Sequence, residues 1–303
     1  MNSQASDKQA VVSGLGAVVL WSTVATAFNL SLNFVTPLTL VTLASVTSWL
    51  FLGGILLISG DLRRLSEITA SEWLRLLALG LINPTLYYFL LFGAYAKLPA
   101  QEAMAINYTW GLVLPLLAVP LLGQALQRRD IGCAAVSYCG VFVIATRGDV
   151  LSFELSDPTG VGLAMSSTVL WALYWIGNTR INTPPIQGLF IGFTSATAVL
   201  LTIAGFTGSL INLPWQALAG GLYIGFFEMG LSFILWLKAM KLTQNTARIS
   251  TLIFLSPPLS LILIWAILDE VIRGSTLVGL AMILAGLAMQ HWQRPTDSSV
   301  CRD

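Results

Sequence analysis

The chain has 303 residues, of which 56% are hydrophobic and only 10% are charged, and its formal net charge is +1. A soluble domain carries about 25% charged residues, so the composition excludes an ordinary soluble protein, and the near-zero charge offers no basic surface for nucleic acid. The mean hydropathy of +0.80 predicts a surface that faces lipid. Cys133, Cys139 and Cys301 form neither a disulfide framework nor a metal-ligand spacing, and we expect no metal and no cofactor.

Long apolar runs recur along the whole chain. A helix needs about 20 apolar residues to cross the hydrocarbon of a bilayer, and backbone in lipid must satisfy its own hydrogen bonds, so each run is predicted to be a helix. The first run is longer than the apolar core of a signal peptide, about 7–15 residues, and is interpreted as a retained span. The predicted spans are 11–30, 36–59, 73–95, 101–122, 131–146, 159–179, 186–206, 215–240, 245–267 and 275–292.

The lysines and arginines predict how these spans are oriented. If the N-terminus is cytoplasmic, alternation of the loops places only Lys97, Arg147 and Arg273 outside, and the other twelve of the 15 basic residues inside. Loops rich in Lys and Arg stay on the cytoplasmic side. Both termini of this multi-pass protein are therefore predicted to lie in the cytoplasm, and the membrane is predicted to be the cell inner membrane.

The two halves of the sequence resemble each other. Val19-Leu20-Trp21 recurs as Val169-Leu170-Trp171, and Ala96-Lys97-Leu98 recurs as Met240-Lys241-Leu242. Each half would hold five spans, an odd number, so the second half must enter the membrane from the opposite side. Inverted repeats of this kind are typical of secondary transporters. Divergence of a duplicated helix bundle would also explain the repeat, but not the polar groups described below.

The predicted fold is thus an all-α integral membrane protein with ten transmembrane helices, in two inverted five-helix repeats around a central cavity. A monomer is compatible with this arrangement. Its predicted parts are a cytoplasmic tail (1–10), the first repeat (11–147), a linker (148–158), the second repeat (159–292) and a second cytoplasmic tail (293–303).

One acidic residue, Glu228, is predicted to lie deep in a span, about 19 Å along the run 215–240 at 1.5 Å per residue. A charge at the bilayer centre costs about 2.5–3.5 kcal/mol on insertion scales, and less beside a wet cavity. Glu228 is therefore predicted to face the transport pathway, where it would bind a substrate ammonium group or carry a proton. The alternative is a protonated glutamate that is hydrogen-bonded between helices.

Aromatic and amide side chains lie at similar predicted depths. Aromatic rings stack on ring substrates and bind ammonium groups by cation–π contacts worth about 0.5–2 kcal/mol, although lipid-facing rings are also common. Amides such as Asn107 could hold a carboxylate or an amine, and Pro84 frees backbone groups next to Asn83. Trp21 is the first-half counterpart of Trp171. The predicted substrate-binding residues are Asn83, Tyr87, Tyr88, Tyr108, Trp110, Trp171, Trp175, Asn178 and Glu228.

Other classes of function are less compatible with the sequence. A phosphate-bearing substrate favours fixed cations at its site, but no Lys or Arg is predicted deep in a span. The one histidine, His291, lies at the end of the last span, and no phosphate-binding loop occurs. We therefore expect neither an intramembrane enzyme nor an ATP-driven pump. A channel or scaffold stays as the alternative to a secondary transporter.

The five-plus-five halves, the Leu-Trp pair that opens each half and the acidic pair Asp269-Glu270 after the ninth span resemble the drug/metabolite transporter superfamily, EamA type. The aromatic content of the spans is similar to that of the bacterial YddG-like amino acid exporters. The resemblance implies export of aromatic and other neutral amino acids, or of a related class of small metabolite, by alternating access. The first half departs from the pattern, since Gly123-Gln124 stands where the second half has Asp269-Glu270.

Overall fold

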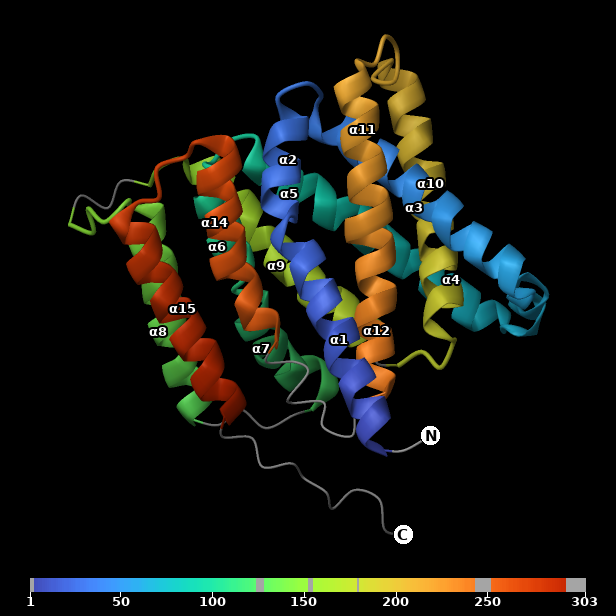
Figure 1. The fold of residues 1–303 in the computed structure, drawn as a ribbon, viewed down its shortest axis with the longest axis horizontal. Coiled ribbons are helices and arrows are strands. Elements are labelled where there is room, and N and C mark those ends of the chain that lie inside the picture. The colour runs from blue at the N-terminus through green and yellow to red at the C-terminus, as the bar shows by residue number, and fades with distance from the viewer. Residues whose placement is uncertain (1–2, 124–127, 152–154, 179, 243–251, 293–303) are drawn as a thin grey trace.

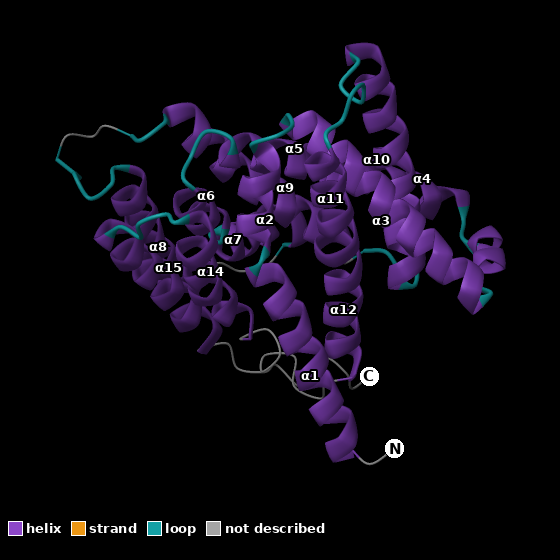
Figure 2. Ribbon diagram, turned by 45° about the horizontal axis from the view of Figure 1, so that its top comes forward, coloured by secondary structure: helices purple, strands orange, loops and turns teal. Residues whose placement is uncertain are grey.

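The computed structural model describes residues 3–123, 128–151, 155–178, 180–242 and 252–292. Every regular element in these ranges is helical, which confirms the predicted all-α class (Figure 2). Seven helical segments of the described chain are long and apolar enough to cross a membrane. Three shorter apolar helices accompany them: Ile131–Ala145, Leu252–Leu268 and Gly274–Met289.

Each of the ten predicted ranges contains a helix. In the ninth range, residues 245–251 lie outside the described residues. The first half holds α1 (Ser3–Ser22), α2 (Val24–Leu32), α3 (Pro37–Ser59), the 3-10 helix η1 (Asp61–Glu67), α4 (Ala70–Gly80), the π-helical segment η2 (Leu81–Leu86), α5 (Tyr87–Tyr95), α6 (Ala100–Asn107), α7 (Trp110–Leu122) and α8 (Arg128–Ala145). The second half holds α9 (Pro158–Asn178), α10 (Pro185–Thr207), α11 (Trp215–Tyr223), the π-helical segment η3 (Ile224–Leu231), α12 (Ser232–Leu242), the 3-10 helix η4 (Leu252–Leu255), α14 (Ser256–Leu268) and α15 (Gly274–Trp292).

Local sequence explains where helices begin and end. The Thr36 hydroxyl accepts a hydrogen bond from the backbone N–H of Thr39, and Pro37 occupies the first turn of α3, where no N–H is needed. Gly60 ends the same helix in the left-handed conformation, with φ of 75°, which a residue without a Cβ adopts at no steric cost. Thr69 caps α4 through the N–H of Glu72 in the same way.

Helices from the two halves pack against each other in a paired pattern. Figures 1 and 2 show α8 beside α15, and α10 packs on both α3 and α4. α1 packs on α12, and α9 packs on α5. α1 and α9 belong to the first span of their halves, and α5 and α12 belong to the third span, so the two contacts are equivalent. The start of α1 and the end of α15 lie at one end of the bundle, called here the terminal end; the opposite end is the distal end.

Glycines allow the closest of these contacts. A Cβ at Gly80 would lie 2.0 Å from the carbonyl oxygen of Gly192, so the backbones of α4 and α10 meet only because residue 80 has no side chain. A Cβ at Gly140 would likewise lie 2.5 Å from the carbonyl oxygen of Gly279, where α8 meets α15. These contacts fix the frame that surrounds the interrupted helices.

Two long spans are interrupted at matching positions. The span Ala70–Tyr95 contains η2, and the span Trp215–Ala239 contains η3, so the third span of each half changes from α to π geometry near its middle. In η2 the backbone of Asn83 is extended, with φ of −140° and ψ of 120°, just before Pro84. Single π turns inside α-helices are frequent at functional sites. The polar residues of the middle of the bundle lie on and around these two segments.

Candidate functional site

The predicted site residues lie on four spans, two of which carry the π-helical segments η2 and η3. Asn83, Tyr87, Tyr88, Trp171 and Glu228 are buried, and the other four are half-buried. Asn83 lies on η2, Tyr87 and Tyr88 begin α5, Tyr108 follows α6, Trp110 begins α7, Trp171, Trp175 and Asn178 belong to α9, and Glu228 lies on η3.

Glu228 is the acidic residue at the centre of this region. The Tyr88 hydroxyl donates a hydrogen bond of 3.0 Å to its Oε1, which links α5 to η3 across 140 residues of sequence. Its Oε2 is buried and accepts no hydrogen bond from any residue that the structure describes. No ion pair to Glu228 occurs among those residues. A buried carboxylate with one oxygen unsatisfied is costly, and such groups in membranes mark ion or substrate pathways.

Trp171 lies at the centre of the aromatic residues. Its ring lies 4.5 Å from that of Tyr87, at an interplanar angle of 35°, and meets Trp110, Trp175 and Phe233 in edge-on contacts at 5.9–6.2 Å. The indole N–H groups of Trp171 and Trp175 are buried and find no acceptor in the described ranges. Indole N–H groups normally find a partner when buried, so these two donors are unusual.

Asn107 connects three helices beside this cluster. Its Oδ1 accepts a hydrogen bond of 3.4 Å from the Tyr87 hydroxyl, and its Nδ2 donates one of 3.1 Å to Ser167 Oγ. Tyr87 belongs to α5, Asn107 ends α6 and Ser167 lies on α9. Buried polar networks of this kind fix the orientation of their members, so Asn107 holds the Tyr87 ring against Trp171.

The remaining predicted residues take different positions. Asn83 is buried, and its Oδ1 has no donor among the described residues. Tyr108 packs on the edge of the apolar core. Asn178 is the last residue of α9 and donates to the Tyr174 carbonyl within its own helix at 2.8 Å. Trp21 does not reach Trp171 directly, but its ring lies 6.1 Å from that of Phe233, which contacts both.

Three residues of this region were not predicted. Tyr174 and Phe233 contact Trp171, and Ser167 holds Asn107. Two of them carry a sequence signal, because Ser167 and Tyr174 lie one helical turn before and after Trp171 and so share its face. Phe233 could not be found in this way, since its contact with Trp171 joins different spans.

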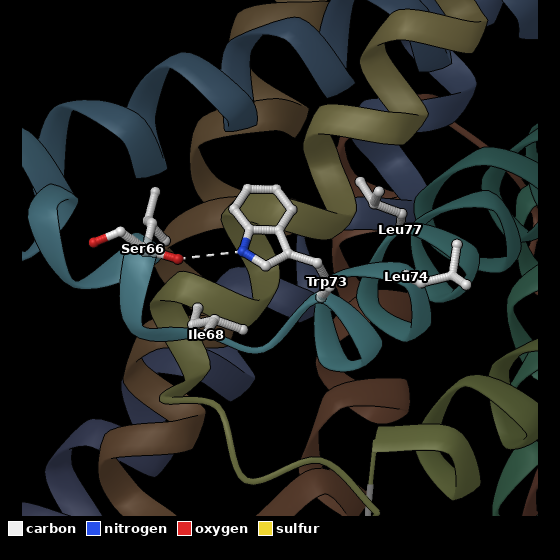
Figure 3. Close-up of a pocket in the computed structure, with 7 residues that line it drawn as sticks. Ser66, Ile68, Trp73, Leu74 and Leu77 are labelled. Atoms are coloured by element: carbon white, nitrogen blue, oxygen red, sulfur yellow. Dashed lines mark hydrogen bonds between the residues drawn. The ribbon is translucent and has the colours of Figure 1, made fainter.

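An open pocket of about 540 Å³ lies elsewhere, on the surface formed by η1 and α4 (Figure 3). Its walls are mainly apolar, and the Trp73 side chain lies across it with its indole N–H donating to the Leu65 carbonyl at 3.2 Å. None of the predicted site residues lines this pocket. The hydrogen bond of Trp73 joins α4 to η1, and residues of these two helices line the pocket.

The central region combines polar and aromatic groups. It offers one carboxyl group, the unsatisfied amide oxygen of Asn83, two unsatisfied indole N–H groups and several aromatic faces. The described ranges contain no group of three or more His, Cys, Asp and Glu residues that could hold a metal ion. These groups suit a small polar molecule with an aromatic or apolar part.

Comparison with known proteins identifies the family. Residues 8–146 and 158–290 each match the EamA-like transporter family. The chain is 26% identical to the "Aromatic amino acid exporter YddG" of Ancylobacter novellus, over 94% of this chain and 97% of that protein. It is 25% identical to the "Probable terminal-alkyne amino-acid exporter" of Streptantibioticus cattleyicolor, over 69% of this chain and 70% of that protein.

A solved crystal structure shares the fold, with a TM-score of 0.67 and 22% identity over 93% of this chain and 96% of the other. The two family matches together cover nearly all of the sequence between residues 8 and 290. The protein therefore belongs to the EamA-like transporter family and contains two copies of the family's repeat.

Proposed function

We propose that this protein is a secondary transporter that exports aromatic and other neutral amino acids, with related small metabolites, by alternating access. In this proposal ten helices cross the inner membrane as two inverted five-helix repeats, and both termini face the cytoplasm. Rocking of the repeats exposes the central region first to one side and then to the other. Export is the direction that the names of the relatives carry.

Two features support an arrangement of two related halves. The contact of α1 with α12 is equivalent to the contact of α9 with α5. Two copies related by a twofold axis are expected to show this pattern. The π-helical segments η2 and η3 also occupy matching positions in the two family repeats. The distribution of Lys and Arg along the sequence supports the cytoplasmic side for the termini.

The half-satisfied carboxylate of Glu228, surrounded by aromatic rings, is the observation that carries the proposal. In the proposed complex, a substrate ammonium group binds Glu228 Oε2 and the faces of Tyr87 and Trp171. The substrate carboxylate accepts from the indole N–H groups of Trp171 and Trp175. An α-amino acid carries one donor group and one acceptor group, which complements this pair of unsatisfied acceptors and donors.

Uptake into proteoliposomes tests the proposal. Labelled aromatic and neutral amino acids should enter vesicles that contain the protein in a saturable manner, and an excess of substrate inside should accelerate the exchange. Trp171→Ala and Glu228→Gln should each lower the rate at least tenfold. The matched controls are Trp265→Ala, whose side chain is 63% exposed on α14, and Glu67→Gln, whose side chain is also exposed; both should transport like the parent protein.

The same vesicles separate the alternatives. A channel would conduct without saturation and without acceleration by internal substrate, and a scaffold would give no flux. Equal rates for the parent, Trp171→Ala and Glu228→Gln proteins would refute the assignment of the site. Flux measured with and without an imposed proton gradient separates proton-coupled antiport from facilitated diffusion.

A further inference from the structure

A second buried carboxylate lies away from the proposed site, in the first turn of α6. Glu102 is 1% exposed and accepts hydrogen bonds from three side chains. Arg147 Nε lies 3.1 Å and Arg273 Nη1 3.0 Å from Glu102 Oε1, and Ser156 Oγ lies 2.7 Å from Oε2. The carboxylate is thus fully paired, whereas both arginines keep about two-fifths of their side chains exposed.

The neighbouring residue extends this cluster to the loop between α14 and α15. Gln101 Nε2 donates to Glu270 Oε1 at 2.6 Å and to the carbonyl of Val271 at 3.0 Å, and its Oε1 accepts from the N–H of Arg273. Glu270 Oε2 also accepts from the N–H of Ala100, at 3.1 Å. The start of α6 is therefore held on the loop by side-chain and backbone contacts together.

The charges balance, and they come from both halves of the chain. Glu102 and Arg147 belong to the first matched repeat or its end, and Glu270 and Arg273 to the second. Glu102 meets both guanidinium groups, whereas Glu270 accepts hydrogen bonds from the neutral N–H groups of Ala100 and Gln101. Removing one partner of an ion pair with a buried member strongly destabilises the folded protein. The cluster therefore fastens the halves to each other at the distal end of the bundle.

Backbone geometry next to the cluster is specialised. Arg147, just after α8, and Asp269, just after α14, both adopt positive φ, of 55° and 52°. Residues with a Cβ enter this region only where the surrounding structure holds them there. The left-handed turns end α8 and α14 so that Arg147 and Glu270 can face α6.

The sequence of the first repeat differs at the position equivalent to Glu270. The repeat aligns Gly123-Gln124 with Asp269-Glu270, so the position equivalent to Glu270 carries a neutral amide. Gln124 itself lies outside the described residues. The acidic acceptor that Glu270 contributes at the distal end therefore corresponds to a neutral side chain in the first repeat.

We propose that Gln101, Glu102, Arg147, Glu270 and Arg273 form a latch that closes the distal end of the transport pathway and must open in each cycle. The proposal rests on the transport function proposed above. The ion pairs of Glu102 and the hydrogen bonds to Glu270 stabilise the closed distal state. The first movement on opening is the release of α6 from the α14–α15 loop.

Cysteine accessibility tests the latch without any substrate. In a protein with Cys133, Cys139 and Cys301 replaced by Ala, Ser167→Cys places one thiol at the central site. A membrane-impermeant maleimide is applied from the distal side in sealed vesicles. Glu102→Gln and Glu270→Gln should each increase the labelling rate at least tenfold. Lys97→Gln, which removes an exposed charge at the same end without altering the latch, should leave it unchanged.

Several outcomes would overturn the latch. Equal labelling rates in the parent, Glu102→Gln and Glu270→Gln proteins would do so, as would an equal increase in Lys97→Gln. Size-exclusion profiles show whether each variant is folded; if Glu102→Gln is not, Glu270→Gln, which alters only the capping side of the cluster, decides the test.

The experiment also distinguishes the latch from the transport proposal. If no amino acid is transported but the latch variants still label faster, the latch is upheld and the proposed function is wrong. If flux is observed and labelling does not change, the transport proposal stands and the latch is refuted.

Discussion

The hydrogen bond between Tyr88 and Glu228 provides a quantitative test of the proposed site. Tyr88→Phe removes the hydroxyl and leaves Glu228 Oε1 without the 3.0 Å donor that the structure shows. Since Oε2 is already unsatisfied among the described residues, the carboxylate would then lie in the bilayer with neither oxygen paired. Glu228→Gln keeps the shape and an acceptor for Tyr88, but it removes the charge that a substrate ammonium group would bind.

The expected magnitudes follow from the environment. Side-chain hydrogen bonds inside membrane proteins average about 0.6 kcal/mol and reach about 1.7 kcal/mol, so Tyr88→Phe should lower kcat/KM by roughly 3- to 20-fold. A hydrogen bond to a charged group contributes about 1.5–3 kcal/mol, so Glu228→Gln should lower it by roughly 10- to 150-fold. Because the two residues touch, their effects should not add, and the coupling energy should exceed about 0.5 kcal/mol.

The assay is initial-rate amino acid uptake by proteoliposomes containing the parent, each single variant or the double variant. Tyr138→Phe is the matched control, because Tyr138 is a half-buried tyrosine on α8, away from Glu228. Its kcat/KM should equal that of the parent. Additive effects within about 0.3 kcal/mol would refute the reasoning, since they would mean that Tyr88 does not act on the substrate through Glu228.

Two further predictions concern packing and are measured as thermal unfolding in detergent. Asn107→Leu should destabilise the protein by about 1–3 kcal/mol, because it leaves the Tyr87 hydroxyl and Ser167 without their shared partner, whereas Asn178→Ala loses one bond within its own helix and should cost less. Gly140→Ala should cost about 1–3 kcal/mol by overpacking α8 on α15. Gly132→Ala on the same helix meets nothing within 4 Å, so its better helix propensity should make it neutral or stabilising by up to about 1 kcal/mol. A Gly140→Ala protein as stable as Gly132→Ala would contradict the close contact.

The helices could be predicted because lipid limits what the backbone can do. A run of apolar residues in a bilayer must be a helix, and this constraint acts on each segment separately. The interruption at η2 was indicated by Asn83 and Pro84. The interruption at η3 was not, since the sequence Ile224–Leu231 contains no proline; this segment packs against α3, which lies far away in the sequence.

The site and the latch differ in how much of each could be predicted. The predicted depths along the spans placed Glu228, Tyr88 and Trp171 at a similar level of the membrane. In the structure these side chains lie in one region. The two arginine partners of Glu102 could not be found in this way, because they lie 45 and 171 residues away along the chain and belong to no motif. The loop assignment nevertheless placed Arg147 and Arg273 on the same side of the membrane, which is the condition for their meeting at one carboxylate.

The short helix α6 connects the proposed latch to the proposed site. Glu102 lies in its first turn and Asn107 is its last residue, so about 7.5 Å of helix separates them at 1.5 Å per residue. A helix of two turns with internal hydrogen bonds moves as a unit, and a displacement of its start is therefore transmitted to Asn107. Since Asn107 holds Tyr87 against Trp171, release of the latch would also loosen the aromatic wall of the site. Opening of the pathway and weakening of substrate binding would then be two consequences of one movement, as export requires at the side where the substrate leaves.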